Sequence, residues 1–204
     1  MNRRVRSRNS RLTWILVLAV VLAGGCDTIR DAASGGFNGV ELTDLKTAPE
    51  ISLADADGNL FELGAQRGRV VLLFFGYTHC PDICPTTLAD WSRVRAALGA
   101  DADKVRFVFV SVDPDRDTPA ISQAYATRFN PAFIGLTADD ATIARLRSGL
   151  NLVAQVEQAD SSGVYGVAHS SQVYLVDQKG RLRILYPFGS TAGDMLGDIQ
   201  RLVR

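Results

Sequence analysis

Two cysteines lie four residues apart in the segment Cys80-Pro81-Asp82-Ile83-Cys84-Pro85. That spacing would place both thiols on one face of a helix, but each cysteine precedes a proline, which disfavours helical geometry in the residue before it. We therefore expect both cysteines on a stiff loop, followed by a helix that begins at Pro85. A helix N-terminus stabilises negative charge and lowers the pKa of a nearby thiol. The segment thus predicts a pair of reactive thiolates, suited to metal binding or to disulfide exchange.

The chain contains two histidines, His79 and His169, and each is a candidate third partner for the thiols. His79 is adjacent to Cys80, but neighbouring side chains at the end of a strand point apart. His169 lies in a predicted loop just before a strand that starts at Gln172, and a thioredoxin-like topology would place this loop beside the helix N-terminus. Thiolates select Cu(I), and imidazole also suits Cu(II). Two sulfurs and one nitrogen therefore favour copper.

The hydrophobic pattern predicts the elements that must position these residues. Continuous apolar or alternating runs predict strands at 70–75, 105–112, 152–156, 172–176 and 182–186. Helical spacing predicts helices from 85 to about 98, 119 to about 129, 139–150 and 192–203, and a hairpin is expected around Asp57-Gly58-Asn59. This order predicts an α/β protein with a thioredoxin-like fold: a mixed sheet covered by helices on both faces, with an added N-terminal β-hairpin. Ligands of such folds gather at the carboxyl ends of parallel strands, where the cysteine segment lies.

Three segments of the chain follow a recognisable order: Phe75 to Pro85, Val110 to Pro119, and His169-Ser170-Ser171 ahead of a strand. Together they resemble the Sco/SenC family of copper-binding assembly factors for the CuA centre of cytochrome c oxidase. The resemblance covers roughly residues 45 to 203. It departs from the family at Ala168, where an aspartate often precedes the histidine, so the contribution of that aspartate is missing here.

The resemblance implies that Cys80, Cys84 and His169 are ligands of Cu(I), Cu(II) or both. It implies a membrane-anchored copper chaperone that delivers copper to the CuA-bearing subunit of cytochrome c oxidase. Because Cys80 and Cys84 are close in sequence, we expect them to form a disulfide when oxidised, which would make a thioredoxin-like reductant a partner. Other copper chaperones are further expected partners.

The alternative function is that of a thiol–disulfide oxidoreductase, which would use Cys80 and Cys84 to reduce target cysteines. His169 distinguishes the two functions, because it would bind copper but is not needed for simple dithiol exchange. An inert disulfide is a further alternative, since exported proteins favour disulfides. Structural zinc normally needs four ligands, and His79 is the only other histidine, so the residues disfavour a zinc site. A peroxidase-like activity would leave His169 without a role.

The second strand is followed by three acidic residues, Asp113, Asp115 and Asp117. The family resemblance suggests a role for them at the site, and turn formation and helix capping explain them equally well. Asp82 is either a residue that supports the site or docks a partner, or a solvated acid of the loop. Thr118 is the expected N-cap of the next helix, with Pro119 at its first position.

The first 25 residues have the features of a signal peptide, with five arginines followed by an apolar run of about 12 residues, shorter than a membrane span. The run ends in Leu22-Ala23-Gly24-Gly25-Cys26, which resembles a bacterial lipoprotein signal and implies lipidation of Cys26. A plain cleaved signal or an uncleaved anchor is the alternative. We expect a tether at 26–44 and the thioredoxin-like copper-binding domain at 45–204, lipid-anchored on the periplasmic face of the bacterial inner membrane.

The charge of the chain argues against a nucleic-acid partner. The 204 residues contain 22 basic and 22 acidic side chains, but without residues 1–25 only 17 basic side chains remain. Nucleic-acid binding relies on basic surfaces that release counterions. The mature part therefore has the wrong charge for that function.

Overall fold

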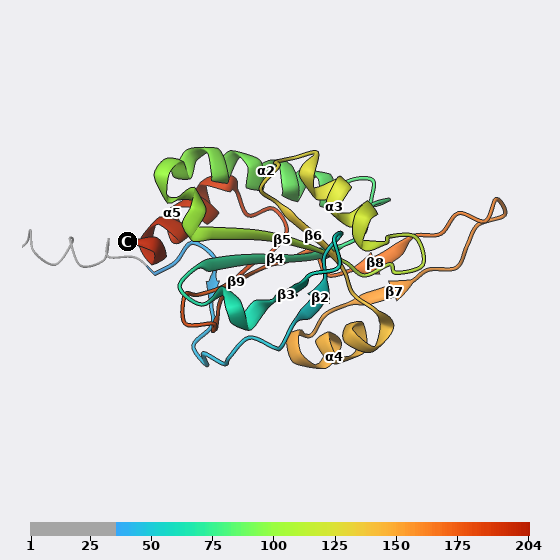
Figure 1. Cartoon of the computed structure of the whole chain (residues 1–204), viewed down its shortest axis with the longest axis horizontal. Helices are drawn as coiled ribbons and strands as arrows, with labels where there is room; N and C mark the ends of the chain where they lie inside the picture. The colour runs from blue at the N-terminus through green and yellow to red at the C-terminus, as the bar shows by residue number, and fades with distance from the viewer. Residues whose placement is uncertain (1–35) are drawn as a thin grey trace, which may run out of the picture. The chain divides into compact units, whose positions relative to one another are not determined.

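The computed structural model describes residues 36–204, and the predicted signal peptide and Cys26 lie outside the described residues. A central sheet of six strands has the order β1-β10-β9-β4-β5-β6 (Figure 1). Its strands are β1 (Val40–Glu41), β4 (Val70–Gly76), β5 (Val105–Ser111), β6 (Ile134–Thr137), β9 (Val173–Val176) and β10 (Leu182–Tyr186). Two separate two-stranded sheets are formed by β2 (Ser52–Ala54) with β3 (Leu60–Glu62), and by β7 (Ala154–Val156) with β8 (Val167–His169).

Strand β4 is the centre of the fold. It pairs in parallel with β5 and antiparallel with β9, and all seven of its residues are buried. Its β-branched and aromatic side chains suit a strand that is covered on both faces. The carboxyl ends of β4 and β5 lie side by side, with Gly76 paired to Ser111. The loops that follow these two strands therefore meet at one edge of the sheet.

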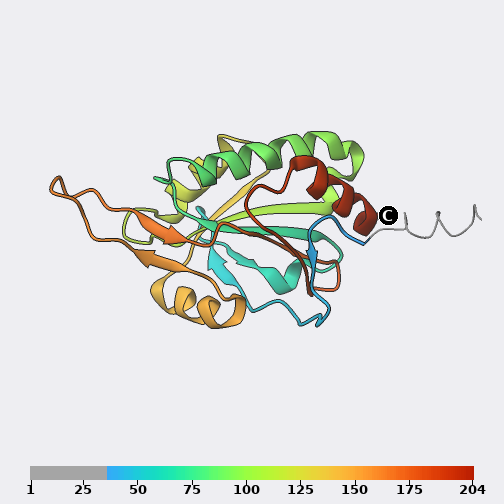
Figure 2. The ribbon, with the colours of Figure 1, turned by 180° about the vertical axis from the view of Figure 1, so that it is seen from behind.

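Helices cover both faces of the sheet, as the sequence predicted (Figures 1 and 2). Helices α2 (Ile83–Leu98), α3 (Pro119–Thr127) and α5 (Ala192–Val203) lie on one face, and α4 (Asp140–Leu150) lies on the other. The side chains of Thr118, Asp139 and Thr191 cap the N-termini of α3, α4 and α5. Short 3₁₀ helices follow β3 and α2, at η2 (Leu63–Gln66) and η3 (Gly99–Lys104). Within residues 36–204, no helix has the length and apolar character needed to cross a membrane.

The predicted hairpin before the first buried strand is confirmed, since β2 and β3 pair antiparallel around the turn at residues 55–59. Asp55 closes this turn: its backbone N–H donates to the Asn59 carbonyl, and its carboxylate accepts the Asn59 N–H. Gly58 has a φ of 85°, which favours glycine. The thioredoxin-like mixed sheet with an added hairpin is therefore present.

Strands β1, β6 and β8 were not predicted. The first begins the folded unit earlier than the predicted boundary at residue 45, because Val40 and Glu41 pair with β10. The buried Asp198 carboxylate explains this extension, since it accepts hydrogen bonds from the N–H groups of Asn38 and Gly39 at 2.8 and 2.9 Å. A buried carboxylate requires such donors. The last residues of the predicted tether are therefore part of the domain.

Candidate metal centre

The cysteine segment follows β4 at the carboxyl edge of the sheet. A turn brings Cys80 back toward the strand, with its N–H donating to the Tyr77 carbonyl at 3.2 Å. Helix α2 begins at Ile83, so Cys84 lies in its first turn. The prediction that the helix begins at Pro85 and that both cysteines lie on a loop was therefore wrong for Cys84. The first four N–H groups of a helix have no partner within the helix. Pro85 lies in the first turn, so its missing N–H costs the helix no hydrogen bond.

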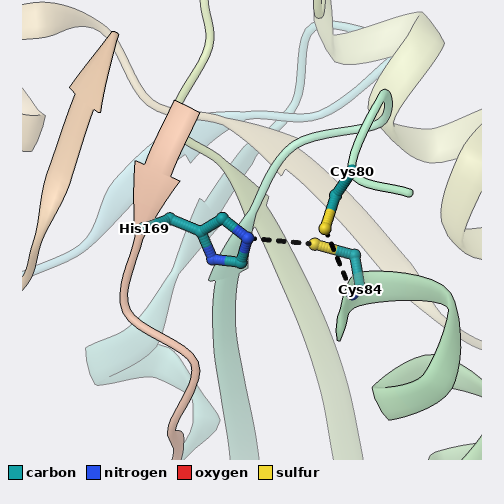
Figure 3. Close-up of side chains that lie close together, drawn as sticks. All are labelled: Cys80, Cys84 and His169. Atoms are coloured by element: carbon teal, nitrogen blue, oxygen red, sulfur yellow. Dashed lines mark hydrogen bonds between the residues drawn. The ribbon is translucent and has the colours of Figure 1, made fainter. Parts of the chain in front are cut away.

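The structure brings Cys80, Cys84 and His169 together (Figure 3). One donor atom from each residue lies within 4.8 Å of the other two. The Cys84 Sγ is 3.7 Å from His169 Nε2, and the Cys84 backbone N–H donates to the Cys80 sulfur at 3.5 Å. This is the only group of three or more such donors within residues 36–204. Its two sulfurs and one nitrogen could hold a metal ion.

His169 is the last residue of β8, where the sequence predicted a loop. Its Nδ1 lies 3.0 Å from the carbonyl oxygens of Phe75 and Ser170, which can only accept hydrogen bonds. Nδ1 therefore carries a proton, and Nε2, on the opposite side of the ring, faces the sulfurs. In the neutral ring the electron pair of Nε2 is available to a metal ion. Metal-bound histidines in proteins commonly donate their other N–H to such a carbonyl. The Phe75 carbonyl thus orients the imidazole toward the cysteines.

The rings of Phe74 and Tyr77 pack edge-on against the His169 ring, at centroid distances of 6.0 and 5.6 Å. These neighbours limit rotation of the imidazole. The site opens into a cavity of about 580 Å³ beside the β7–β8 hairpin (residues 154–169). The cavity is lined by residues of the cysteine segment, by Asn151 and Val153 just before β7, and by residues 167–172. The donor set is therefore packed against aromatic rings on one side, at His169, and is open to the cavity on the other.

The two thiols differ in burial and charge. Cys80 is 9% exposed and Cys84 is fully buried. The hydrogen bond with Cys84 is the largest influence on the Cys80 thiol, and it lowers the pKa. Burial acts in the opposite direction, and a hydrogen bond with His169 lowers the pKa further. The net result is a pKa of about 3 for Cys80, compared with the ordinary 9.0. Burial, together with the adjacent Cys80 thiolate, raises the pKa of Cys84. Burial opposes protonation of His169, but its hydrogen bonds with Cys80 and Ser170 raise its pKa overall. The reduced pair is therefore one thiolate and one thiol.

His79, the other candidate, is not part of the donor group. Its side chain is 59% exposed, and its Nδ1 lies 3.8 Å from the Asp117 carboxylate and 3.2 Å from the Thr78 hydroxyl. Asp117 is buried and accepts hydrogen bonds from the Thr78 N–H and from the hydroxyls of Thr78 and Ser111. It therefore ties the loop after β4 to the end of β5.

The other two aspartates of the acidic loop differ from each other. Asp113 is buried, and its carboxylate pairs with Arg116 Nε at 2.5 Å and accepts the Tyr165 hydroxyl at 3.0 Å. Asp115 is exposed. None of the three aspartates caps a helix, because Thr118 does so. Asp113 and Asp117 hold the loops around the site in place. Sequence reasoning missed Tyr77, Tyr165 and Arg116 as neighbours of the site.

A thioredoxin-like fold with two thiols and an imidazole at the carboxyl end of its central strand defines a class of thiol and metal-binding proteins. The family model described as SCO1/SenC matches residues 41–204, and this chain belongs to the SCO1/SenC family. The family resemblance seen in the sequence is thereby confirmed.

The chain is similar to several characterised relatives. It is 32% identical over 181 residues to the SCO2-like protein of Rickettsia prowazekii, covering 84% of this chain and 88% of the relative. Among solved structures, copper-bound ScoI of Bradyrhizobium japonicum is 37% identical, with a TM-score of 0.70 over 77% of this chain and 99% of ScoI. The apo Sco1 protein of Thermus thermophilus is 34% identical, with a TM-score of 0.74 over 83% of this chain and 99% of Sco1.

Proposed function

We propose that this chain binds copper through Cys80, Cys84 and His169 and acts in the assembly of cytochrome c oxidase. The observation that carries the proposal is the convergence of two sulfurs and one imidazole nitrogen within 4.8 Å of one another. Soft thiolate donors select Cu(I), and the imidazole extends the site to Cu(II). The similarity to ScoI of Bradyrhizobium japonicum, whose structure has copper bound, supports the choice of metal.

The finer proposal is a membrane-tethered chaperone that delivers copper to the CuA-bearing subunit of the oxidase. Its supports are membership of the SCO1/SenC family and the lipoprotein-like sequence before Cys26. In this proposal residues 1–25 are a signal peptide, Cys26 is lipidated, and the domain lies on the periplasmic face of the inner membrane. A thioredoxin-like reductant keeps Cys80 and Cys84 reduced before copper is loaded, and other copper chaperones supply the metal.

Anaerobic titration of the reduced domain with Cu(I), against a chromophoric competitor, tests copper binding. We expect one copper per domain, and marked weakening in Cys80→Ser, Cys84→Ser and His169→Ala. The matched control is His79→Ala, which removes the other imidazole and should bind like the wild type. Wild-type affinity in His169→Ala together with weak binding in His79→Ala would overturn the ligand set.

Delivery is tested separately, by mixing the copper-loaded domain with the metal-free, reduced CuA domain of subunit II. The expected result is copper bound to the recipient after the two proteins have been separated, transferred from the wild type and not from the Cys84→Ser variant. A loaded domain that retains its copper beside a competent recipient would contradict delivery and leave copper binding intact.

Mass spectrometry of the native protein tests the lipid anchor. Lipidation predicts an acylated chain that begins at Cys26.

A second function, thiol–disulfide exchange, is favoured by the contrast between the two cysteines. Cys80 has its pKa lowered to about 3, whereas burial raises the pKa of Cys84. An accessible thiolate beside a buried thiol is the arrangement that a dithiol reductant needs, because one sulfur attacks and the other resolves the mixed disulfide. Reduction of an oxidised CuA domain by the wild type and by His169→Ala tests this function. Equal rates in both proteins are expected if exchange does not depend on the imidazole.

A further inference from the structure

The three donors come from two separate parts of the chain. The cysteines follow β4, and His169 lies 85 residues after Cys84 on the β7–β8 hairpin. Strand β8 pairs only with β7, so the central sheet does not fix its position through a ladder of hydrogen bonds. Figure 1 shows the hairpin extending beyond the edge of the central sheet. Other contacts must therefore set the distance between the imidazole and the sulfurs.

Arg116 contacts the hairpin both through a ring and through a hydrogen bond. Its guanidinium carbon lies 3.6 Å from the centroid of the Tyr165 ring, and its Nη1 donates to the Tyr165 carbonyl at 3.0 Å. The Asp113 carboxylate accepts from both Arg116 and the Tyr165 hydroxyl. Asp113 is 1% exposed, and charge-assisted hydrogen bonds are stronger where water is excluded. Arg116, Asp113 and Tyr165 therefore form a closed triangle between the acidic loop and the hairpin.

Arg116 also reaches the cysteine segment. Its guanidinium carbon lies 5.6 Å from the centroid of the Tyr77 ring. The carbonyl of Tyr77 accepts the Cys80 N–H, and its ring packs against the His169 ring. One side chain thus contacts the residue that shapes the loop of Cys80 and the segment that carries His169. A planar guanidinium can do this because it stacks on rings and donates in several directions at once.

We propose that Arg116 is a positioning residue that fixes the separation between His169 and the cysteine pair, and thereby sets the affinity of the site for copper. The proposal deepens the proposed function, on which its affinity readout rests. Without the guanidinium, the hairpin loses the hydrogen bond and the ring contact that Tyr165 makes with Arg116, and the Tyr77 ring loses its contact with Arg116. The imidazole then occupies a wider range of positions relative to the sulfurs, and the metal-bound arrangement is reached less often.

The first test is a double-mutant cycle in anaerobic Cu(I) competition titrations, with Arg116→Met and His169→Ala. Removal of groups that orient a ligand typically weakens metal binding by about 10- to 100-fold, and we expect about 10-fold for Arg116→Met. In the His169→Ala background the same substitution should have almost no effect, because there is no imidazole left to position. Wild-type affinity in Arg116→Met, or an equal loss in both backgrounds, would overturn the proposal.

The matched control is Arg183→Met. Arg183 also pairs with a carboxylate, that of Glu41 at 2.7 Å, and lies 5.1 Å from a ring, that of Phe37, but it contacts none of the three donors. It should leave copper affinity unchanged. Arg116→Lys keeps the positive charge but loses the planar guanidinium and its several donors. Its copper affinity should therefore lie between those of Arg116→Met and the wild type. If Arg116→Met does not fold, Tyr165→Phe removes a single hydrogen bond of the triangle and should give a smaller loss of the same kind.

A second readout needs no copper. In the reduced, metal-free protein, nitrogen-detected NMR of the His169 imidazole reports the hydrogen bond from Nδ1 to the Phe75 carbonyl. We expect Arg116→Met to broaden or shift the His169 signals and to leave those of His79 unchanged. Unchanged His169 signals would overturn the positioning role. Failure of the wild type to bind copper would instead contradict the proposed function, and the NMR comparison would still test Arg116.

Discussion

The two halves of the donor set differ in how the fold holds them. Cys84 is fully buried in the first turn of α2, against the central strand β4. The β7–β8 hairpin and its flanking residues, by contrast, expose large apolar side chains, with Val153, Val156 and Val164 at 52%, 52% and 64%. The core therefore sets the position of the sulfurs, whereas a few polar and ring contacts set that of the imidazole.

The largest expected effect concerns the sulfur half as a whole. Oxidation of Cys80 and Cys84 to a disulfide draws the sulfurs to about 2.05 Å and removes both thiolates. We expect Cu(I) affinity to fall by more than the roughly 100-fold that changes around a ligand can cause, because His169 alone remains. The measurement is the anaerobic copper titration after confirmed loss of two free thiols. Re-reduction should restore binding, and tight binding by the oxidised domain would mean that the cysteines are not ligands.

Packing around Cys84 gives the next effect. A Cβ added to Gly76 would overlap the Cys84 sulfur and lie 3.1 Å from the Phe109 ring. Overpacking of this kind costs about 1–3 kcal/mol, so we expect Gly76→Ala to lower the free energy of unfolding by that amount and to weaken copper binding. Urea denaturation measures the first and copper titration the second.

Gly64→Ala is the control for this substitution, because a Cβ there meets nothing within 4 Å. It should change the free energy of unfolding by no more than about 0.5 kcal/mol. Equal stability of the two variants would contradict a rigidly packed sulfur half.

The charge of Cys80 gives a pH-dependent effect. Its pKa in the folded protein is about 3, well below the ordinary 9.0, so the thiolate stabilises the fold at pH near 9 and this contribution is lost as the pH falls toward 3. The difference in free energy of unfolding between the reduced wild type and Cys80→Ser should therefore shrink steadily as the pH falls through this range. Thiolate absorbance at 240 nm should show one ionised cysteine at pH 7. Two protonated thiols at that pH would contradict the assignment.

The smallest effect is expected at the tip of the hairpin. The Asp160 carboxylate accepts hydrogen bonds from the Ser162 N–H and hydroxyl at 2.7 and 2.6 Å, and from the Val164 N–H at 3.0 Å. Asp160→Ala should loosen this exposed turn and alter copper affinity by less than about twofold, as expected for a site that shares no partner with the donors. The copper titration measures it. A loss as large as that of Arg116→Met would show that the whole hairpin, and not its attachment at Arg116, positions His169.

Much of the fold could be predicted because its main elements have strong local patterns. The amphipathic helix at 192–203 and the buried strand at 70–75 are examples, and the structure has them at Ala192–Val203 and Val70–Gly76. Strands β1, β6 and β8 have only two to four residues each. Such strands are too short to show a period, and they form only because a partner strand is adjacent.

The site likewise has a part that the sequence predicts and a part that it does not. The types and order of Cys80, Cys84 and His169 marked them in the sequence, and the structure brings them together. The Nδ1 contact with the Phe75 carbonyl and the stacking of Arg116 on Tyr165 join residues far apart in the chain. No local pattern predicts such contacts. The start of α2 at Ile83 was missed because a proline disfavours helical geometry in the residue before it but does not exclude it.

X-ray absorption at the copper edge of the Cu(I)-loaded domain identifies the atoms bound to the metal, and so tests the ligand set itself. We expect two sulfurs and one imidazole nitrogen in the wild type and in His79→Ala, and loss of the nitrogen with retention of both sulfurs in His169→Ala. A spectrum with fewer than two sulfurs, or one in which His169→Ala keeps the imidazole signal, would contradict this ligand set.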